Sequence, residues 1–265
     1  MQKNAMTITL STLVMGIFGA FLRWLQNVGI YEQDTGLAIR GAGISAAVLI
    51  FTLLVLALQI GIACFWLRET NRLQSAEEAF HTDRILPILL GWLCCAVYAV
   101  GGIMLMFSAG STAMPVMQRL LGAFAIVAGV CFPFLPSRIK YEGASQLGKQ
   151  VTSSLLSLFF CFWLVYSYRS GAQVPSLWTY APEIVALSAG ALAFYYVCGW
   201  CFGRVRPKIS LIMLQFAAFL CIAVLPDDRN RAVTLLLIAA AAMLLMLEYL
   251  FVNNLLRTEP APAEE

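Results

Sequence analysis

Charged side chains are scarce in this sequence. Asp, Glu, Lys and Arg make up 12% of the 265 residues, whereas hydrophobic residues make up 61%. Soluble domains carry about 25% charged and about 45–50% apolar residues, because water must solvate their surface. The composition therefore excludes an ordinary water-soluble domain and predicts that lipid is the solvent for much of the surface.

Histidine is nearly absent, since His81 is the only one. A single histidine excludes paired-histidine metal sites and the HExxH motif of zinc proteases, and the sequence has no GxSxG or phosphate-binding-loop motif. We therefore expect no cofactor and none of these enzymatic activities. The net charge of only +3, without a basic patch, also argues against nucleic acid as a partner.

Long apolar runs, in contrast, are numerous. Hydrocarbon about 30 Å thick needs about 20 apolar residues per helix, and backbone amides in lipid must be paired within that helix. These runs predict an all-α, polytopic transmembrane helical bundle of about eight spans, which is one membrane domain over residues 1–257. The spans are expected near 5–24, 42–67, 85–108, 117–136, 151–168, 181–203, 209–226 and 232–253. The remainder, 258–265, is predicted to be a disordered cytoplasmic tail.

Small residues recur at helical spacing within these runs. Gly91, Cys95 and Ala99 are four residues apart, as are Ala125 and Gly129. Such spacing lets helix backbones approach closely and predicts a tightly packed bundle. All eight cysteines also fall inside apolar runs, which favours packing over disulfide formation.

Basic residues are distributed unequally between the two sides of the predicted bundle. Eleven of the 17 fall on the side of the termini and six on the other: Arg23, Arg40, Arg119, Arg169, Arg229 and Arg231. Positive residues are retained in the cytoplasm. Both termini are therefore predicted to be cytoplasmic, with the plasma membrane as the expected location.

Three polar residues within the apolar runs are candidates for a functional site. A carboxylate in an apolar helix is costly, which makes Glu248 a functional hypothesis. Gln59 and Gln215 lie about a third of the way in from the cytoplasmic side, and the three predict an inner polar cluster. The cluster would either line a pathway or bond helices together. We also expect Glu248 near the inner interface, within reach of water or of a basic partner such as Arg204.

The connection between residues 68 and 84 is the second candidate region. Leu73, Ala76 and Phe80 follow helical spacing, with Glu77 and Glu78 opposite them. This pattern predicts a surface, made by Leu73, Glu77, Glu78 and Phe80, for a cytoplasmic or membrane protein partner. A solvated loop on the membrane surface is the alternative.

Three functions remain open from the sequence. The first is a small permease-like or transporter-associated membrane subunit, because the chain has many spans, short connections and no enzymatic residue set. The second is a scaffold or sensor that binds a partner through the 68–84 connection. The third is a membrane enzyme acting on lipid, which is least favoured because the sequence shows no paired acid and base.

Overall fold

The computed structural model describes residues 2–30, 43–66, 75–82, 84–109, 114–136, 144–171, 177–227 and 229–257. In these ranges the chain is all-helical, which confirms the predicted fold class. The long helices are α1 (Gln2–Ile30), α2 (Gly43–Trp66), α4 (Ile85–Ser108), α5 (Pro115–Cys131), α6 (Ala144–Gly171), α7 (Leu177–Cys201), α8 (Pro207–Ala223) and α9 (Arg231–Arg257). Two short helices, α3 (Ala76–Ala79) and the 3₁₀ turn η2 (Phe132–Phe134), complete the described part.

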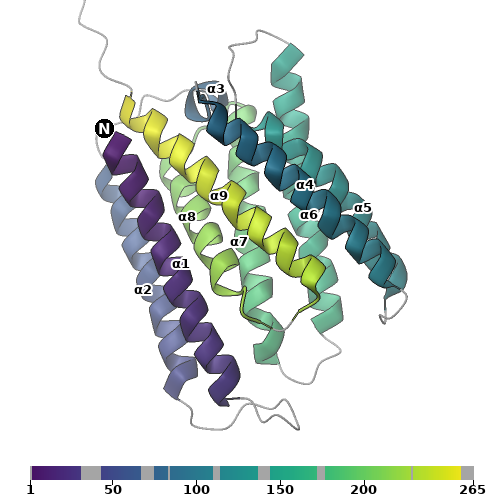
Figure 1. Ribbon diagram of the computed structural model, residues 1–265. Coiled ribbons are helices and arrows are strands. Elements are labelled where there is room, and N and C mark those ends of the chain that lie inside the picture. Colours follow the sequence, from purple (N-terminus) through teal and green to yellow (C-terminus); the bar gives the residue numbers. More distant parts are fainter. Residues whose placement is uncertain are drawn as a thin grey trace, which may run out of the picture.

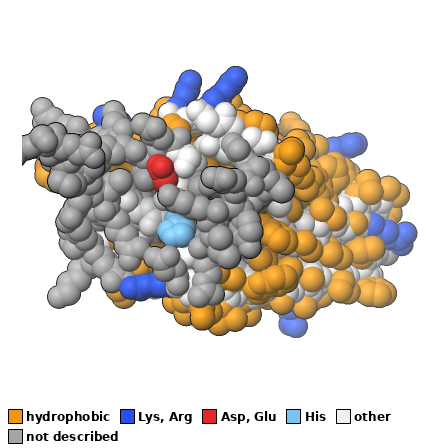
Figure 2. Space-filling view, turned by 90° about the horizontal axis from the view of Figure 1, so that it is seen from above, with side chains coloured by type: hydrophobic (Ala, Val, Ile, Leu, Met, Phe, Trp, Pro, Cys, Tyr) orange, Lys and Arg blue, Asp and Glu red, His pale blue; other side chains and the backbone are white. Residues whose placement is uncertain are grey.

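Seven of these helices are long and apolar enough to cross a membrane, and α8 is a shorter apolar helix. Leu54 of α2, Leu89 of α4 and Val185 of α7 illustrate the many large hydrophobic side chains that face outward. In the view onto the α3 end (Figure 2), hydrophobic side chains cover the visible flanks, with Lys and Arg at the edges. Apolar surface on this scale needs lipid, and the chain is a multi-pass membrane protein.

Helix α8 occupies the centre of the arrangement. It packs against α1, α2, α7 and α9, while α9 also contacts α1 and α4 (Figure 1). α4 and α5 form one close pair and α6 and α7 form another. The beginning of α1 and the end of α9 lie at the same end of the bundle, as an even number of spans requires.

Local sequence explains where several helices begin and end. Pro115 and Pro207 occupy the first position of α5 and α8, where a missing amide proton costs nothing. After α7, Gly203 adopts a φ of 74°, and the Arg204 amide donates to the Gly199 carbonyl. This Schellman turn favours glycine and directs the chain into α8.

Each predicted span overlaps one of the long helices, but the bounds differ. The largest difference is α6, which has 28 residues although the apolar run predicted 151–168. Its first two turns are polar and continue the helix past the apolar segment. The eight cysteines form no disulfide within the described ranges. The predicted tail, 258–265, lies outside the described residues.

Candidate functional site

Glu248 lies inside the bundle at the meeting point of three helices. Its side chain is completely buried. The Thr12 hydroxyl of α1 donates to Glu248 Oε1 at 2.9 Å, and Gln215 Nε2 of α8 donates to the same oxygen at 3.2 Å. We call Thr12, Gln215 and Glu248 the Glu248 cluster. The structure therefore joins two of the three predicted site residues and adds Thr12, which the sequence analysis did not select.

The members of the cluster and Gln59 lie at similar depth. Counting from the nearest end of each apolar span at 1.5 Å per residue, Thr12 and Glu248 lie about 10 Å deep. By the same count, Gln215 lies about 12 Å and Gln59 about 9 Å from the same end of the bundle. These depths are about a third of a hydrocarbon core, as the sequence predicted for the two glutamines.

Several polar atoms at this depth lack partners among the described residues. Glu248 Oε2, Gln215 Oε1 and both side-chain polar atoms of Gln59 are buried without a hydrogen bond there. Gln59 is fully buried in α2, which packs on α1 and α8, but no bond links it to the cluster. A buried polar atom without a partner costs about 1–3 kcal/mol and calls for an explanation.

One sequence expectation for Glu248 is wrong. We expected its carboxylate near the interface, in contact with water or paired with Arg204. Instead its side chain is completely buried, and its bonds go to Thr12 and Gln215. The neighbouring helices α1 and α8 shield the carboxylate from water. The expectation considered only the position of Glu248 along its own helix and so did not include this shielding.

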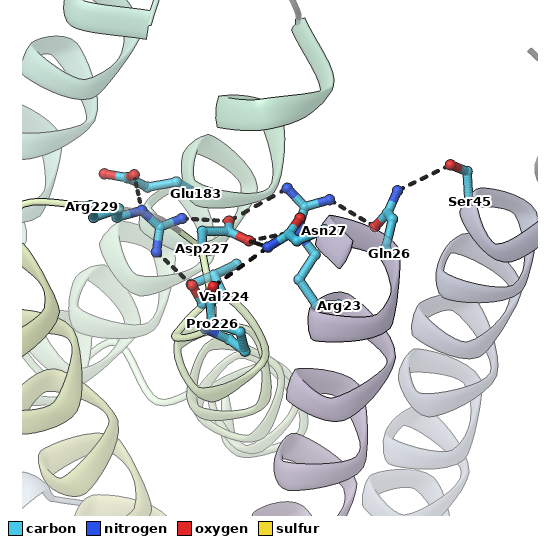
Figure 3. Close-up of polar contacts among 9 residues, drawn as sticks. All are labelled: Arg23, Gln26, Asn27, Ser45, Glu183, Val224, Pro226, Asp227 and Arg229. Atoms are coloured by element: carbon cyan, nitrogen blue, oxygen red, sulfur yellow. Dashed lines mark hydrogen bonds and ion pairs between the residues drawn. The ribbon is translucent and has the colours of Figure 1, made fainter. Parts of the chain in front are cut away.

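A second polar group lies at the opposite end of the bundle, where four charged side chains form a buried chain of ion pairs. Arg23 Nε donates to Asp227 Oδ1 at 2.7 Å, and Arg229 Nη2 donates to Asp227 Oδ2 at 2.7 Å. Arg229 Nε also donates to Glu183 Oε2 at 2.5 Å. We call Arg23, Glu183, Asp227 and Arg229 the charged network (Figure 3). Two cations balance two anions, and each side chain is at most 12% exposed.

The charged network depends on the shortness of α8. That helix ends at Ala223, so the following turn lies beside the last turns of α1 rather than in solvent. Arg229 Nη1 donates to the Val224 carbonyl at 2.5 Å, and Asn27 Nδ2 donates to Asp227 Oδ1 at 2.9 Å. Figure 3 shows the network continuing through Gln26 to Ser45 of α2. The network thus ties α1, α2, α7 and the α8–α9 turn together.

The sequence analysis did not identify this network. Its members come from three distant stretches of the chain and lie near helix ends, where charged residues usually belong to solvated loops. Two of its members, Arg23 and Arg229, were considered only in the count of basic residues that predicts the orientation in the membrane. The available signal was Glu183, an acidic residue six residues after the start of α7 in an otherwise apolar run.

The predicted partner-binding surface is only partly described. Phe80 is 2% exposed and packs on Phe251 of α9 with ring centroids 6.2 Å apart, so it cannot form an exposed contact. Asn254 anchors the same turn by donating to the carbonyls of Ala79 and His81. Glu78 is exposed. Leu73 lies outside the described residues, as does the Glu77 side chain.

Comparisons with protein-family models, curated proteins and solved structures find no match to this chain. The function must therefore be inferred from the arrangement of the side chains. Within the described ranges, no group of three His, Cys, Asp or Glu side chains could hold a metal ion. The Glu248 cluster and the charged network are notable among the described residues because they hold carboxylates inside the bundle. Along α1 they are about 17 Å apart, because Thr12 and Arg23 are separated by 11 residues.

Proposed function

We propose that this protein is a small permease-like membrane subunit in which Glu248 binds a proton or a small monovalent cation during transport. The observation that carries the proposal is the fully buried Glu248 carboxylate, with one oxygen bonded to two helices and the other without a partner among the described residues. Ionisable groups inside a membrane are costly and mark ion or proton pathways.

The surrounding groups support an ion site. Glu248 Oε2 and Gln215 Oε1 are both acceptors without hydrogen bonds in the described part. Oxygen atoms are the ligands that hard cations prefer, and a carboxylate also takes up a proton. Because Thr12, Gln215 and Glu248 come from three helices, binding at this point can alter how α1, α8 and α9 pack.

The charged network supports the same proposal from the other end of the bundle. Its ion pairs hold α1 to α7 and to the turn between α8 and α9, and α1, α8 and α9 are the helices of the Glu248 cluster. Alternating access requires a binding group inside the bundle and an end of the bundle that can close and open. Breaking and re-forming of these pairs would open and close that end.

Purified protein in liposomes tests this proposal. We expect an imposed inside-negative potential to drive proton or Na⁺ uptake faster than in empty liposomes, as read by a trapped pH-sensitive or Na⁺-sensitive dye. Glu248→Gln keeps the size and hydrogen bonding of the side chain but removes the ionisable group. We expect it to reduce uptake to the rate of empty liposomes.

Glu78→Gln is the matched control, because it removes an exposed carboxylate from α3. It should leave uptake unchanged. Size-exclusion profiles and melting temperatures of both variants establish that each is folded. Wild-type uptake of both ions at the empty-liposome rate would overturn the proposal, as would a folded Glu248→Gln variant with the wild-type rate.

A further inference from the structure

A lateral groove of about 510 Å³ opens between α1, α4 and α9. Both α1 and α4 contact α9, which therefore forms the floor through Ala242, Leu245 and Tyr249. Met6 of α1 and Leu90 of α4 contribute to the walls. Figure 1 shows the three helices side by side in their upper parts, at the end where the chain begins.

The groove has the dimensions and direction of a lipid chain. It extends from Arg84 and Tyr249 at one end to Leu90 and Ala242 at the other, and seven residues of α9 cover about 10 Å. One leaflet of hydrocarbon is about 15 Å deep, half of the whole core. A groove that starts at the membrane surface and runs about two thirds through a leaflet matches an acyl chain lying parallel to the helices.

Arg84 places a positive charge at the mouth of the groove. It directly precedes α4, is exposed, and its guanidinium has no hydrogen bond or ion pair to any described residue. A guanidinium presents a planar fork of donors that matches phosphate. Thr9 also lines the groove, and its Oγ1 is buried without a hydrogen-bond partner among the described residues.

We propose that this groove binds one anionic phospholipid from the surrounding leaflet. One acyl chain lies on the α9 floor and the phosphate pairs with Arg84. The walls accept the chain because they are apolar, and the Arg84 cation at the mouth selects a headgroup with net negative charge. The inference is independent of the transport proposal, since it does not involve Glu248.

Native mass spectrometry of the detergent-purified full chain tests this inference, with phosphatidylglycerol compared against phosphatidylcholine of the same chains. The wild type is expected to retain phosphatidylglycerol preferentially. Arg84→Gln should reduce that preference about fivefold, because one basic residue contributes about 1 kcal/mol to binding at an anionic surface. Leu90→Trp fills the groove and should reduce the retention of both lipids.

Matched controls separate the site from general effects. Arg206 is an exposed arginine that directly precedes α8 at the same end of the bundle, so Arg206→Gln should keep the preference. Leu89 faces outward at the same depth as Leu90, and Leu89→Trp should keep the retention. Equal wild-type binding of the two lipids would overturn the proposal, as would equal losses in a variant and its control.

Discussion

Asp227 is the most heavily shared side chain of the charged network. Its two oxygens accept from Arg23, Arg229 and Asn27, and it is 6% exposed. Both guanidinium groups, of Arg23 and Arg229, form ion pairs with this one carboxylate, and Arg229 also pairs with Glu183. Removal of one partner from a buried pair is far more costly than removal of the whole pair, because the remaining charge stays out of water.

We therefore expect Asp227→Asn to destabilise the protein by about 3–5 kcal/mol. This corresponds to a fall in melting temperature on the order of 10 °C. The measurement is thermal unfolding in detergent. Arg231→Gln, an exposed substitution at the same end of the bundle, is the control and should change stability by less than about 0.5 kcal/mol. Equal melting temperatures for the two variants would contradict this role of Asp227.

Single residues also show what the sequence could and could not predict. Gln215 and Glu248 were predictable, because a polar residue in an apolar run is conspicuous and depth follows from counting along a helix. Thr12 was not, since a helical threonine usually bonds its own backbone and gives no distinct signal. Phe80 was misassigned to a surface because its partner, Phe251, lies 171 residues further along the chain.

At the scale of elements, glycines set the spacing between α4 and α5. A methyl group at Gly122 would approach the Gly102 carbonyl oxygen to 2.5 Å, and a methyl group at Gly102 would meet the Gly122 oxygen equally closely. Gly129 lies against the Cys95 carbonyl in the same pair. The small residues predicted on these two helices thus lie where α4 and α5 contact each other. Gly102 and Gly122 were not among the residues selected from the sequence.

Gly122→Val should force α4 and α5 apart. Backbone cannot move aside as a side chain can, so we expect a loss of about 1–3 kcal/mol. The matched control is Gly61→Val on α2, where an added methyl group meets nothing within 4 Å. Melting temperatures in detergent measure both variants. A Gly122→Val protein as stable as Gly61→Val would show that the two helices can separate without cost.

The helix bounds show why element lengths were harder to predict than element number. The length of an apolar run follows the thickness of the hydrocarbon layer. The length of a helix is set instead by how far its backbone hydrogen bonds continue. α6 continues into polar residues, and its 28 residues span about 42 Å, more than the hydrocarbon thickness. α8 has 17 residues, and it can be short because other helices, rather than lipid, surround most of it.

At the scale of the whole molecule, the Glu248 cluster and the charged network lie toward opposite ends of the bundle. The Glu248 cluster and the lateral groove lie toward the end that holds the start of α1 and the finish of α9. The charged network lies at the other end. Under the proposed function, an ion would reach Glu248 from the side of the termini in this conformation.

The arrangement of the helices does not determine which end of the bundle faces the cytoplasm. The distribution of basic residues predicts it. Of the six on the side away from the termini, Arg23 and Arg229 are buried in ion pairs with Asp227 and Glu183. Their charge is balanced within the protein, but the rule counts basic residues rather than net charge, so the asymmetry of eleven to six stands. Both termini should therefore be cytoplasmic.

Fusions expressed in a bacterial inner membrane test this sidedness. A green fluorescent protein fused after Glu265 should fluoresce, because it folds only in the cytoplasm, whereas alkaline phosphatase at that point should be inactive. A truncation after Asn230, in the α8–α9 turn, is the matched control and should give active phosphatase and no fluorescence. If both fusion points gave the reverse pattern, the membrane-spanning fold would stand but its orientation would be inverted. Arg84 and the groove would then face the outer leaflet.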